Sequence, residues 1–552
     1  MGILRTLKNV EIILQKESNE VLKKVYGYDS FRPGQEKMIN AVLSGRDAFA
    51  VMPTGAGKSV CFQIPALMLE GITIVVSPLI SLMKDQVEAL NAAGIHAAYF
   101  NSSLTPGQYR KALELARGGR YKIIYVAPER LETESFMDFV RDENVYIPFV
   151  AIDEAHCVSQ WGQDFRPGYL RISDFINSFE ERPMVGAYTA TATEAVKKDI
   201  IELLGLKNPE TVTTGFDREN LYFGVQMPRD KYSQLKFYLT DKEEALPGAS
   251  GIVYCATRKL VEEVSGRLEA DGFSVTKYHA GLSEKERIEN QEAFINGEKQ
   301  IVVATNAFGM GIDKSDVRYV IHYNMPKDME SYYQEAGRAG RDGDMAECIL
   351  YYAKSDWHLN NWLIEHGREA NSELSDEQKT EVMAKDKERL KRMTYYCRSK
   401  YCLRDAILRY FGEKGVKNCG NCSVCLKEKE EEILRIPIDV DGDYDYHGER
   451  SYSKPARTYT SAKKKSAAES LEEEDRRIFE ELRKVRTAIA KESRLHPYMI
   501  FSDRTLASMA VERPKNKSEM LKISGVGQNK FEKYGKRFLT ALNNSQNSLF
   551  TS

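Results

Sequence analysis

The feature that most constrains this chain is a repeated alternation of short apolar runs with amphipathic stretches. Five runs in the first 205 residues have the composition of buried strands, namely 48–52, 72–77, 123–126, 149–152 and 184–189. Amphipathic segments such as 81–93 and 194–204 lie between them and have helical periodicity. Strands that alternate with helices predict βαβ units, and therefore a parallel sheet covered by helices on both faces.

The same alternation restarts near residue 208. An apolar run at 251–255 precedes a segment whose Leu260, Val261, Val264 and Leu268 form one helical stripe. Further runs at 274–278, 300–304 and 317–322, together with a predicted helix at 283–295, continue the pattern. We therefore expect a second α/β lobe. Two lobes in series create a cleft, where a ligand can drive closure.

The remainder of the chain lacks this alternation. We predict an α/β protein with parallel-sheet lobes over 1–207 and 208–345, and a helical, cysteine-rich module over 346–427. Mixed charge and Asp-Tyr alternation over 428–470 predict a flexible linker. Residues 471–547 carry 16 Lys and Arg against 11 Asp and Glu, and their helical periodicity predicts a small, basic, all-α C-terminal domain.

The overall charge of the chain is close to balanced, with 79 Lys and Arg against 81 Asp and Glu among 552 residues. This balance excludes a protein held to nucleic acid by global charge, so any such partner must contact local basic patches. No run of about 18 apolar residues occurs, and residues 1–10 lack the apolar core of a signal peptide. We expect no membrane association and a cytoplasmic protein.

A glycine-rich loop at 52–59, Met-Pro-Thr-Gly-Ala-Gly-Lys-Ser, follows a predicted strand and precedes a predicted helix. Backbone N–H groups of such a loop face phosphate oxygens, the lysine reaches the β- and γ-phosphates, and the hydroxyl binds Mg²⁺. Met52 stands where the strict motif has glycine, so the loop is a relaxed variant. The residues expected to hold the nucleotide phosphates are Thr54, Gly55, Gly57, Lys58 and Ser59.

Two further groups complete a nucleotide-hydrolysis site. Asp153 and Glu154 end an apolar strand, where α/β sheets bind ligands. We expect Asp153 to hold Mg²⁺ with Ser59, and Glu154 to orient or deprotonate the attacking water. Arg338 and Arg341 lie beside glycines on the second lobe, from which their guanidinium groups would neutralise the phosphoryl group in transfer.

Five of the nine cysteines fall within 397–425. Cys402 is followed by 16 residues and then by Cys419, Cys422 and Cys425 at Cys-x-x-Cys spacing. Four thiolates suit a closed, structural Zn²⁺ site. Cys397 competes with Cys402 as the first ligand, and an iron–sulfur cluster or ordinary reduced cysteines are the alternatives.

Together these motifs resemble the superfamily-two helicases, and more narrowly the RecQ family of DNA helicases, over about 20–427 and 471–547. The segment 26–35, Tyr-Gly-Tyr-Asp-Ser-Phe-Arg-Pro-Gly-Gln, is similar to the adenine-recognition motif of that family. The resemblance implies two RecA-like lobes. It also implies that Tyr28 stacks on adenine, Gln35 bonds its edge and Arg32 assists.

Several shorter segments resemble the DNA-contacting motifs of the family. They are 77–86, 127–130, the coupling motif 188–193 and the fifth motif 304–314. By that likeness Thr305 contacts a DNA phosphate and Asp313 the nucleotide. An aromatic-rich loop at 159–168 offers Trp161 and Phe165 for base stacking, and Arg166 adds positive charge.

The cysteine pattern is also similar to that of the family, in which the first ligand precedes Tyr-Phe-Gly, as Cys402 precedes 410–412. Segments 496–506 and 521–530 resemble the HRDC domain, a helicase-and-RNase-D C-terminal module. Its turn at 525–527 can present N–H groups to phosphate, and Lys530 is the candidate DNA contact. A solvated basic face is the alternative interpretation.

The resemblance implies an ATP-dependent DNA helicase that moves 3′ to 5′ on single strands and acts in recombination and repair. ATP, Mg²⁺ and Zn²⁺ are the expected cofactors, with single-stranded, tailed or branched DNA as substrate. Single-strand-binding or recombination proteins are expected partners, and in a bacterium the chain would associate with the nucleoid. The 428–470 segment is too short for the winged-helix domain common in the family. A DNA-structure-binding ATPase that remodels complexes, or an RNA helicase, are the rival interpretations.

Overall fold

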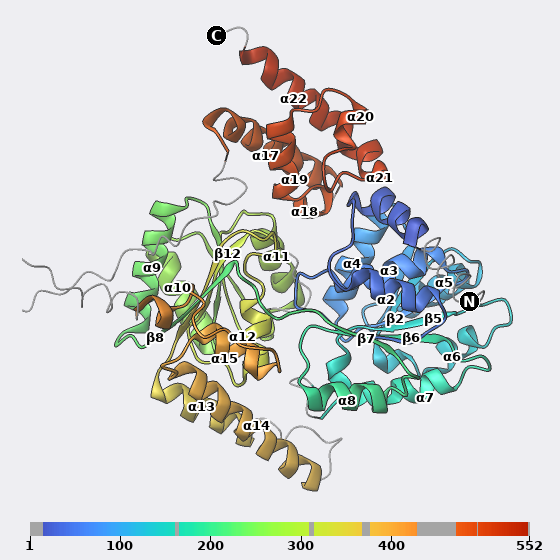
Figure 1. Ribbon diagram of the computed structural model, residues 1–552, viewed down its shortest axis with the longest axis horizontal. Coiled ribbons are helices and arrows are strands. Elements are labelled where there is room, and N and C mark those ends of the chain that lie inside the picture. Colours follow the sequence, from blue (N-terminus) through green and yellow to red (C-terminus); the bar gives the residue numbers. More distant parts are fainter. Residues whose placement is uncertain are drawn as a thin grey trace, which may run out of the picture.

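The computed structural model describes residues 15–160, 165–308, 314–366, 376–427, 471–493 and 495–549. Two α/β lobes lie side by side, a helical module projects from the second lobe, and a C-terminal helical domain sits over both (Figure 1). This arrangement confirms the predicted fold class. None of the helices within the described ranges is long and apolar enough to cross a membrane. Trp161, Asp313 and the predicted linker 428–470 lie outside these ranges.

The first lobe contains a seven-stranded sheet in the order β3-β4-β2-β5-β6-β1-β7, and all of its pairings are parallel. Its strands are β1 (Ala48–Val51), β2 (Thr73–Val76), β3 (Ala97–Phe100), β4 (Ile123–Val126), β5 (Phe149–Ile152), β6 (Met184–Thr189) and β7 (Glu210–Thr213). Its helices are α2 (Gln35–Leu43), α3 (Lys58–Met68), α4 (Ile80–Ala92), α5 (Pro106–Arg117), α6 (Glu134–Val140), α7 (Arg171–Asn177) and α8 (Glu194–Leu203).

Alternate residues of the buried strands enter two separate cores, one on each face of this sheet. In β1, Ala48 and Ala50 pack with side chains from α2, α3 and α4. Phe49 and Val51 point to the opposite core, which α5, α6, α7 and α8 cover. Burial on both faces explains why these strands are continuous apolar runs.

The second lobe contains a six-stranded parallel sheet in the order β10-β11-β9-β12-β13-β8. Its strands are β8 (Leu221–Gln226), β9 (Ser250–Tyr254), β10 (Val275–Tyr278), β11 (Ile301–Ala304), β12 (Val317–His322) and β13 (Ala346–Tyr351). Its helices are α9 (Lys231–Ala245), α10 (Arg258–Ala270), α11 (Glu284–Ile295) and α12 (Met329–Ala336).

Each sheet extends beyond the boundary expected from the sequence. β7 pairs with β1, so the first sheet continues past residue 207. β13 lies between β12 and β8, so the second sheet continues past residue 345. The sequence pattern that predicts a strand is weak at both β7 and β13. β7 is an edge strand with exposed alternate residues, and β13 leads directly into helical sequence.

The helical module contains α13 (Lys354–His366), α14 (Asp376–Cys397) and α15 (Leu403–Tyr410). The ring of Phe411 stacks on Phe216, with centroids 4.3 Å apart. Arg404 donates hydrogen bonds to the backbone oxygens of Arg218 (2.7 Å) and Leu221 (2.6 Å). The module therefore packs against the segment that connects the two lobes.

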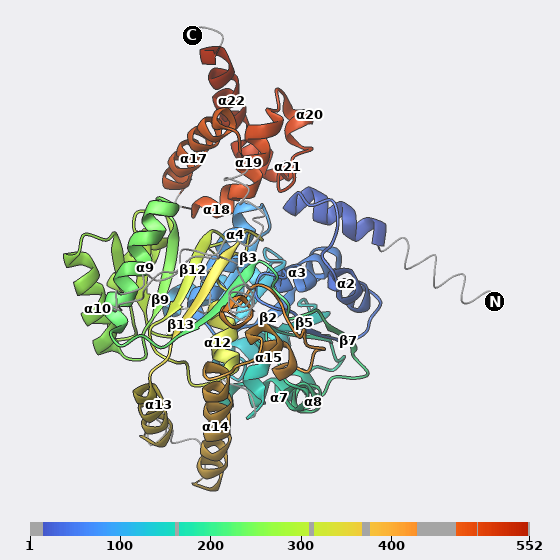
Figure 2. The same cartoon turned by 60° about the vertical axis from the view of Figure 1, so that its left-hand side comes forward.

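The C-terminal domain contains α17 (Glu473–Ser493), α18 (Pro497–Ile500), α19 (Asp503–Glu512), α20 (Lys517–Met520), α21 (Gln528–Lys530) and α22 (Lys536–Leu549) around its own apolar core. It rests against the first lobe (Figure 2). Asn529 Nδ2 donates to the oxygen of Ala93 (2.8 Å), and Lys533 Nζ donates to that of Ala92 (2.5 Å). Both bonds satisfy carbonyls at the C-terminal end of α4, where a cation also complements the helix dipole.

Candidate functional site

The glycine-rich loop lies between the end of β1 and the start of α3. Gly55 (φ 86°) and Gly57 (φ 84°) adopt left-handed backbone conformations, which glycine alone adopts without strain. Met52 is fully buried, and its N–H bonds the oxygen of Thr189 (2.9 Å). Its side chain therefore belongs to the core, so glycine is not required there. Lys58 Nζ lies 3.3 Å from the Met52 oxygen, inside the curve of the loop.

The predicted adenine-motif residues contact this loop directly. Gln35 Nε2 donates to the oxygens of Ala56 (3.2 Å) and Gly57 (3.0 Å), and its Oε1 accepts from the N–H of Arg32 (2.8 Å). Arg32 also hydrogen-bonds the oxygen of Gly55. The structure thus brings Gln35 and Arg32 to the phosphate loop, while Tyr28 is 43% exposed.

The two acidic residues follow β5 and lie close to the lysine of the loop. Burial, followed by the charge of Glu154, raises the pKa of Asp153 to about 7, and Lys58 opposes the shift. Burial alone would also raise the pKa of Glu154. The His156 hydrogen bond and the charges of Lys58 and Arg338 together have a larger, opposite effect. They lower this pKa to about 2. Glu154 is therefore ionised, as a proton acceptor must be.

The backbone of Glu154 has φ 48° and ψ 47°, a left-handed conformation unusual for a residue with a side chain. Such strain persists only where the surrounding structure enforces it, and it is typical of functional sites. The Tyr169 hydroxyl donates a hydrogen bond to the backbone oxygen of Asp153 (2.9 Å) and so stabilises this turn.

Both predicted arginines of the second lobe lie near predicted nucleotide-site residues of the first, Arg341 beside the phosphate loop and Arg338 near Glu154. A Cβ atom at Gly55 would lie 3.5 Å from Cγ of Arg341. Arg338 is 7% exposed, and its charge lowers the pKa of Glu154. A Cβ atom at Gly337 would lie 3.8 Å from Cβ of Thr54, so this glycine lets the two lobes approach closely.

Arg218 also joins the two lobes, and the sequence analysis missed it. Its Nη1 donates to the oxygen of Thr54 in the phosphate loop (3.2 Å), and its Nη2 donates to the oxygens of Ala339 (3.0 Å) and Gly340 (2.7 Å). It therefore ties the loop to the segment that carries Arg338 and Arg341. No local motif surrounds Arg218, so only the fold reveals it.

A second connection between the lobes begins at Glu154. His156 Nδ1 lies 3.3 Å from Glu154 Oε2 and 2.8 Å from Thr189 Oγ1. The Thr189 hydroxyl donates to the oxygen of Thr191 (3.1 Å), and Gln334 Nε2 of α12 donates to the Thr191 hydroxyl (3.1 Å). The segment 188–193 thus links the acidic pair to the second lobe.

Three of the predicted DNA contacts, Phe165, Arg166 and Thr305, fall within the described ranges. Arg166 Nη1 donates to the oxygen of Pro78 (2.8 Å), which places it beside the start of α4. Phe165 is half-buried. Thr305 follows β11, is 8% exposed, and donates its N–H to the oxygen of Tyr278 (3.1 Å).

The structure does not support the expected DNA contact by the C-terminal turn in this arrangement. The N–H of Gly525 donates to the oxygen of Gly27 in the first lobe (3.0 Å). Lys530 is half-buried, and its burial lowers its pKa to about 8. Docking of the C-terminal domain on the first lobe therefore covers the turn, an interdomain contact that the sequence does not reveal.

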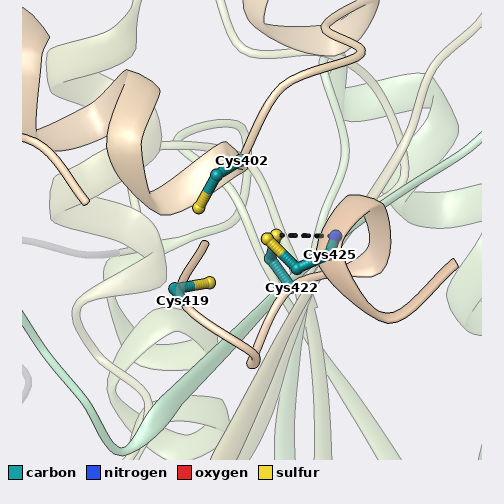
Figure 3. Close-up of side chains that lie close together, drawn as sticks. All are labelled: Cys402, Cys419, Cys422 and Cys425. Atoms are coloured by element: carbon teal, nitrogen blue, oxygen red, sulfur yellow. Dashed lines mark hydrogen bonds between the residues drawn. The ribbon is translucent and has the colours of Figure 1, made fainter. Parts of the chain in front are cut away.

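Four cysteines of the helical module converge in space (Figure 3). The sulfur atoms of Cys402, Cys419, Cys422 and Cys425 all lie within 4.8 Å of one another. The N–H of Cys425 donates to the sulfur of Cys422 (3.5 Å). The hydrogen bond from Cys419 lowers the pKa of Cys422 to about 4, which favours the thiolate. Cys397 is buried outside this cluster.

These donors fit the group expected there, because four convergent thiols form the closed tetrahedral set of a structural Zn²⁺ site. Such an ion supplies folding energy rather than chemistry. Cys402, at the N-cap of α15, is thus the fourth member of the cluster, as the family resemblance implied.

Comparison with protein families identifies the class of protein that this fold and site define. The DEAD/DEAH box helicase family matches residues 32–199, and the helicase conserved C-terminal domain matches 230–343. The RecQ zinc-binding family matches 354–426, and the HRDC domain matches 475–542. The chain is therefore a helicase with two motor lobes, a zinc-binding module and an HRDC domain.

Comparison with individual proteins narrows this class to one family. The chain is 39% identical to the ATP-dependent DNA helicase RecQ of Bacillus subtilis, covering 95% of this chain and 98% of that protein. It is 36% identical to the protein of that name from Pasteurella multocida, over 96% and 94% of the two chains. The chain belongs to the RecQ family. It is an ATP-dependent DNA helicase that uses ATP with Mg²⁺ and binds Zn²⁺.

More distant solved structures share the fold. Mss116p bound to ssRNA and AMP-PNP superposes with a TM-score of 0.51 at 18% identity, covering 64% of this chain and 77% of that one. This likeness shows the two-lobe architecture.

Proposed function

We propose that the chain moves 3′ to 5′ along single-stranded DNA and separates tailed or branched duplexes during recombination and repair. The observation that carries the proposal is that arginines of the second lobe lie at the nucleotide site of the first, Arg341 beside Gly55 of the phosphate loop and Arg338 near Glu154. A motor needs such an arrangement, because the presence of the γ-phosphate then decides whether the lobes close.

The proposed chemistry assigns one task to each group. The Glu154 carboxylate accepts a proton as water attacks the γ-phosphorus, the bond to the bridging oxygen breaks, and ADP leaves. Arg338 and Arg341 neutralise the charge that develops on the transferred group. Lys58 holds the β- and γ-phosphates, while Ser59 and Asp153 are the residues that would hold Mg²⁺. When bound, that ion neutralises phosphate charge.

The remaining site residues serve binding and coupling in this proposal. Tyr28, Arg32 and Gln35 recognise adenine, and Asp313 contacts the nucleotide. Trp161, Phe165, Arg166 and Thr305 hold the DNA strand. The contacts that run from Glu154 through His156 to the 188–193 segment couple ATP hydrolysis to movement of the second lobe. We further propose that the chain acts on nucleoid DNA with single-strand-binding or recombination proteins.

Tailed duplexes test the proposed polarity. A duplex with a 3′ single-stranded tail should be unwound in an ATP-dependent reaction, and the same duplex with a 5′ tail should not. Equal unwinding of both substrates, or unwinding of the 5′-tailed duplex alone, would contradict the proposed direction.

A second candidate function is ATP-driven remodelling of DNA complexes without processive strand separation. The alignment with the Bacillus subtilis relative spans 592 positions, more than the 552 residues of this chain, so that relative has segments that this chain lacks. A missing winged helix would weaken the grip on the duplex at a fork. Strong single-strand-stimulated ATPase with no unwinding of either tailed duplex would favour this alternative.

A further inference from the structure

The first lobe, the second lobe and the C-terminal domain meet beside the middle of α4. Asp85 and Glu88 lie three residues apart on this helix of the first lobe, and so share one of its faces. His496 enters from the C-terminal domain, where it precedes α18. Each of these three residues offers one ligand atom, and the three atoms all lie within 4.8 Å of one another.

The second lobe adds charge to the same junction. Glu292 of α11 lies close enough to raise the pKa of Glu88, although burial contributes more to that shift. Asp85 is 8% exposed. Burial raises the pKa of Tyr278 in β10, Arg287 of α11 lowers it, and the Asp85 charge raises it further, so both charged groups lie near this tyrosine. Lys84 lies 3.9 Å from Glu88 and partly offsets the negative charge.

The imidazole of His496 is suited to metal coordination. Its ring lies nearly parallel to that of Tyr498, with centroids 5.8 Å apart. An imidazole nitrogen is a common ligand of transition metals, so His496 adds a nitrogen donor to the two carboxylates.

We propose that Asp85, Glu88 and His496 form a second metal site, which binds a divalent transition-metal cation of the Zn²⁺ type between the first lobe and the C-terminal domain. One imidazole nitrogen and two carboxylate oxygens form a donor set of intermediate softness, which suits Zn²⁺. Three ligands leave the fourth tetrahedral position for water or a further carboxylate. This site is separate in space and chemistry from the four-cysteine site, which offers sulfur alone.

Such an ion would hold the C-terminal domain in its docked position. Asn529 and Lys533 already attach this domain to the C-terminal end of α4, and the metal would attach it at the middle of the same helix. Undocking removes His496 and leaves two carboxylates, so the docked form binds the ion more tightly. If undocked protein does not bind, Zn²⁺ at about ten times its dissociation constant raises the docked population relative to the undocked one about elevenfold.

Equilibrium dialysis of the full chain against Zn²⁺, with excess Mg²⁺ to fill hard-cation sites, tests the proposal. Wild-type protein should hold two zinc ions per chain. His496→Ala and Glu88→Gln should each hold one, because the cysteine site is untouched. His96→Ala changes an exposed histidine elsewhere on the first lobe and should retain two. One zinc in the wild type, or two in both site variants, would overturn the proposal.

A distance measurement gives an independent readout. Fluorophores on the first lobe and on α22 should show a higher docked fraction when Zn²⁺ is added to the wild type and the His96→Ala variant. The increase should be absent from His496→Ala. A zinc response of equal size in His496→Ala would overturn the proposal even if that variant bound less metal.

Discussion

At the residue scale, Glu154 carries the most specific prediction. Glu154→Gln keeps the size of the side chain but removes the group that accepts a proton from water. ATP turnover should fall by about 10²–10⁴-fold, the usual contribution of a general base. Single-stranded DNA binding should survive, because Glu154 lies at the nucleotide site and not among the predicted DNA contacts. Steady-state ATPase and fluorescence anisotropy with a labelled oligonucleotide measure the two effects.

Lys58→Ala is the companion variant for this experiment. It removes the phosphate-binding charge and should also abolish turnover while DNA binding persists. Unimpaired hydrolysis in either variant would show that the nucleotide site has been assigned to the wrong residues.

Arg218 carries a second prediction at this scale. It bonds the phosphate loop at Thr54 and the arginine segment at Ala339 and Gly340, so it positions groups on both sides of the cleft. Arg218→Ala should lower kcat for ATP by roughly 10–100-fold, as misplacement of catalytic groups typically does. Arg229→Ala, at an exposed position in the same lobe, is the matched control and should leave kcat unchanged.

A merely structural role for Arg218 would lower the melting temperature without this kinetic effect. Arg218→Lys separates the two cases, because it keeps one positive charge but cannot bond both segments at once. A kcat equal to that of the wild type in both Arg218 variants would contradict the positioning role.

Much of the site follows from the sequence because its chemistry depends on contiguous residues. The loop around Lys58 and the pair Asp153 and Glu154 each follow a recognisable strand, so their location could be predicted. Arg218 could not, because its importance comes from four backbone oxygens that the fold gathers around it. The contact of the 525–527 turn with the first lobe could not be predicted either, because sequence alone cannot show which surface another domain covers.

At the scale of elements, the zinc-binding module supports the connection between the lobes. Arg404 in α15 bonds the oxygens of Arg218 and Leu221, and Asn421, between Cys419 and Cys422, also bonds Leu221 (3.1 Å). The cysteine cluster therefore stabilises the segment from which Arg218 reaches the phosphate loop.

Cys419→Ser should consequently affect both metal content and catalysis. Loss of one thiolate should remove Zn²⁺ and destabilise residues 354–426, and the ATPase should fall because Arg218 loses its support. Elemental analysis, thermal unfolding and ATPase measure these effects. Cys397→Ser, which changes a buried cysteine outside the cluster, should retain the metal.

Two outcomes would contradict these predictions. Pure wild-type protein without zinc would exclude a zinc site, and a zinc-free Cys419→Ser variant with wild-type ATPase would show that the module does not support Arg218.

The sequence predicted most central strands because burial on both faces makes them continuous apolar runs, as in β2 and β5. It gave no comparable signal for β7, whose burial alternates at the sheet edge, or for β8, which follows the turn after Arg218. Strand order and lobe contacts depend on long-range packing, which local periodicity cannot specify.

At the scale of the whole molecule, the C-terminal domain is held to the first lobe by few side chains. Asn529 and Lys533 bond backbone oxygens at the end of α4, and the turn at Gly525 bonds Gly27. The 428–470 segment connects this domain to the zinc-binding module. Docking is therefore an intramolecular equilibrium, set by these contacts and by the effective concentration that the connection provides.

Replacing both side chains should shift this equilibrium strongly. Each hydrogen bond contributes about 1 kcal/mol, and one to a charged donor somewhat more, so Asn529→Ala with Lys533→Ala should cost about 2 kcal/mol or more. The ratio of docked to undocked molecules should fall roughly thirtyfold. Energy transfer between fluorophores on the first lobe and on α22 measures the ratio. Lys536→Ala, an exposed lysine beside the docking surface, should leave it unchanged.

Undocking also uncovers the turn at 525–527, which the first lobe covers in the docked arrangement and which Lys530 follows closely in the chain. The double variant should therefore bind single-stranded DNA through this domain more readily than the wild type, and Lys530→Ala in that background should remove the gain. If energy transfer and DNA affinity both stay at wild-type values in the double variant, these two side chains do not control docking, and the C-terminal domain is held by its backbone contacts and apolar packing instead.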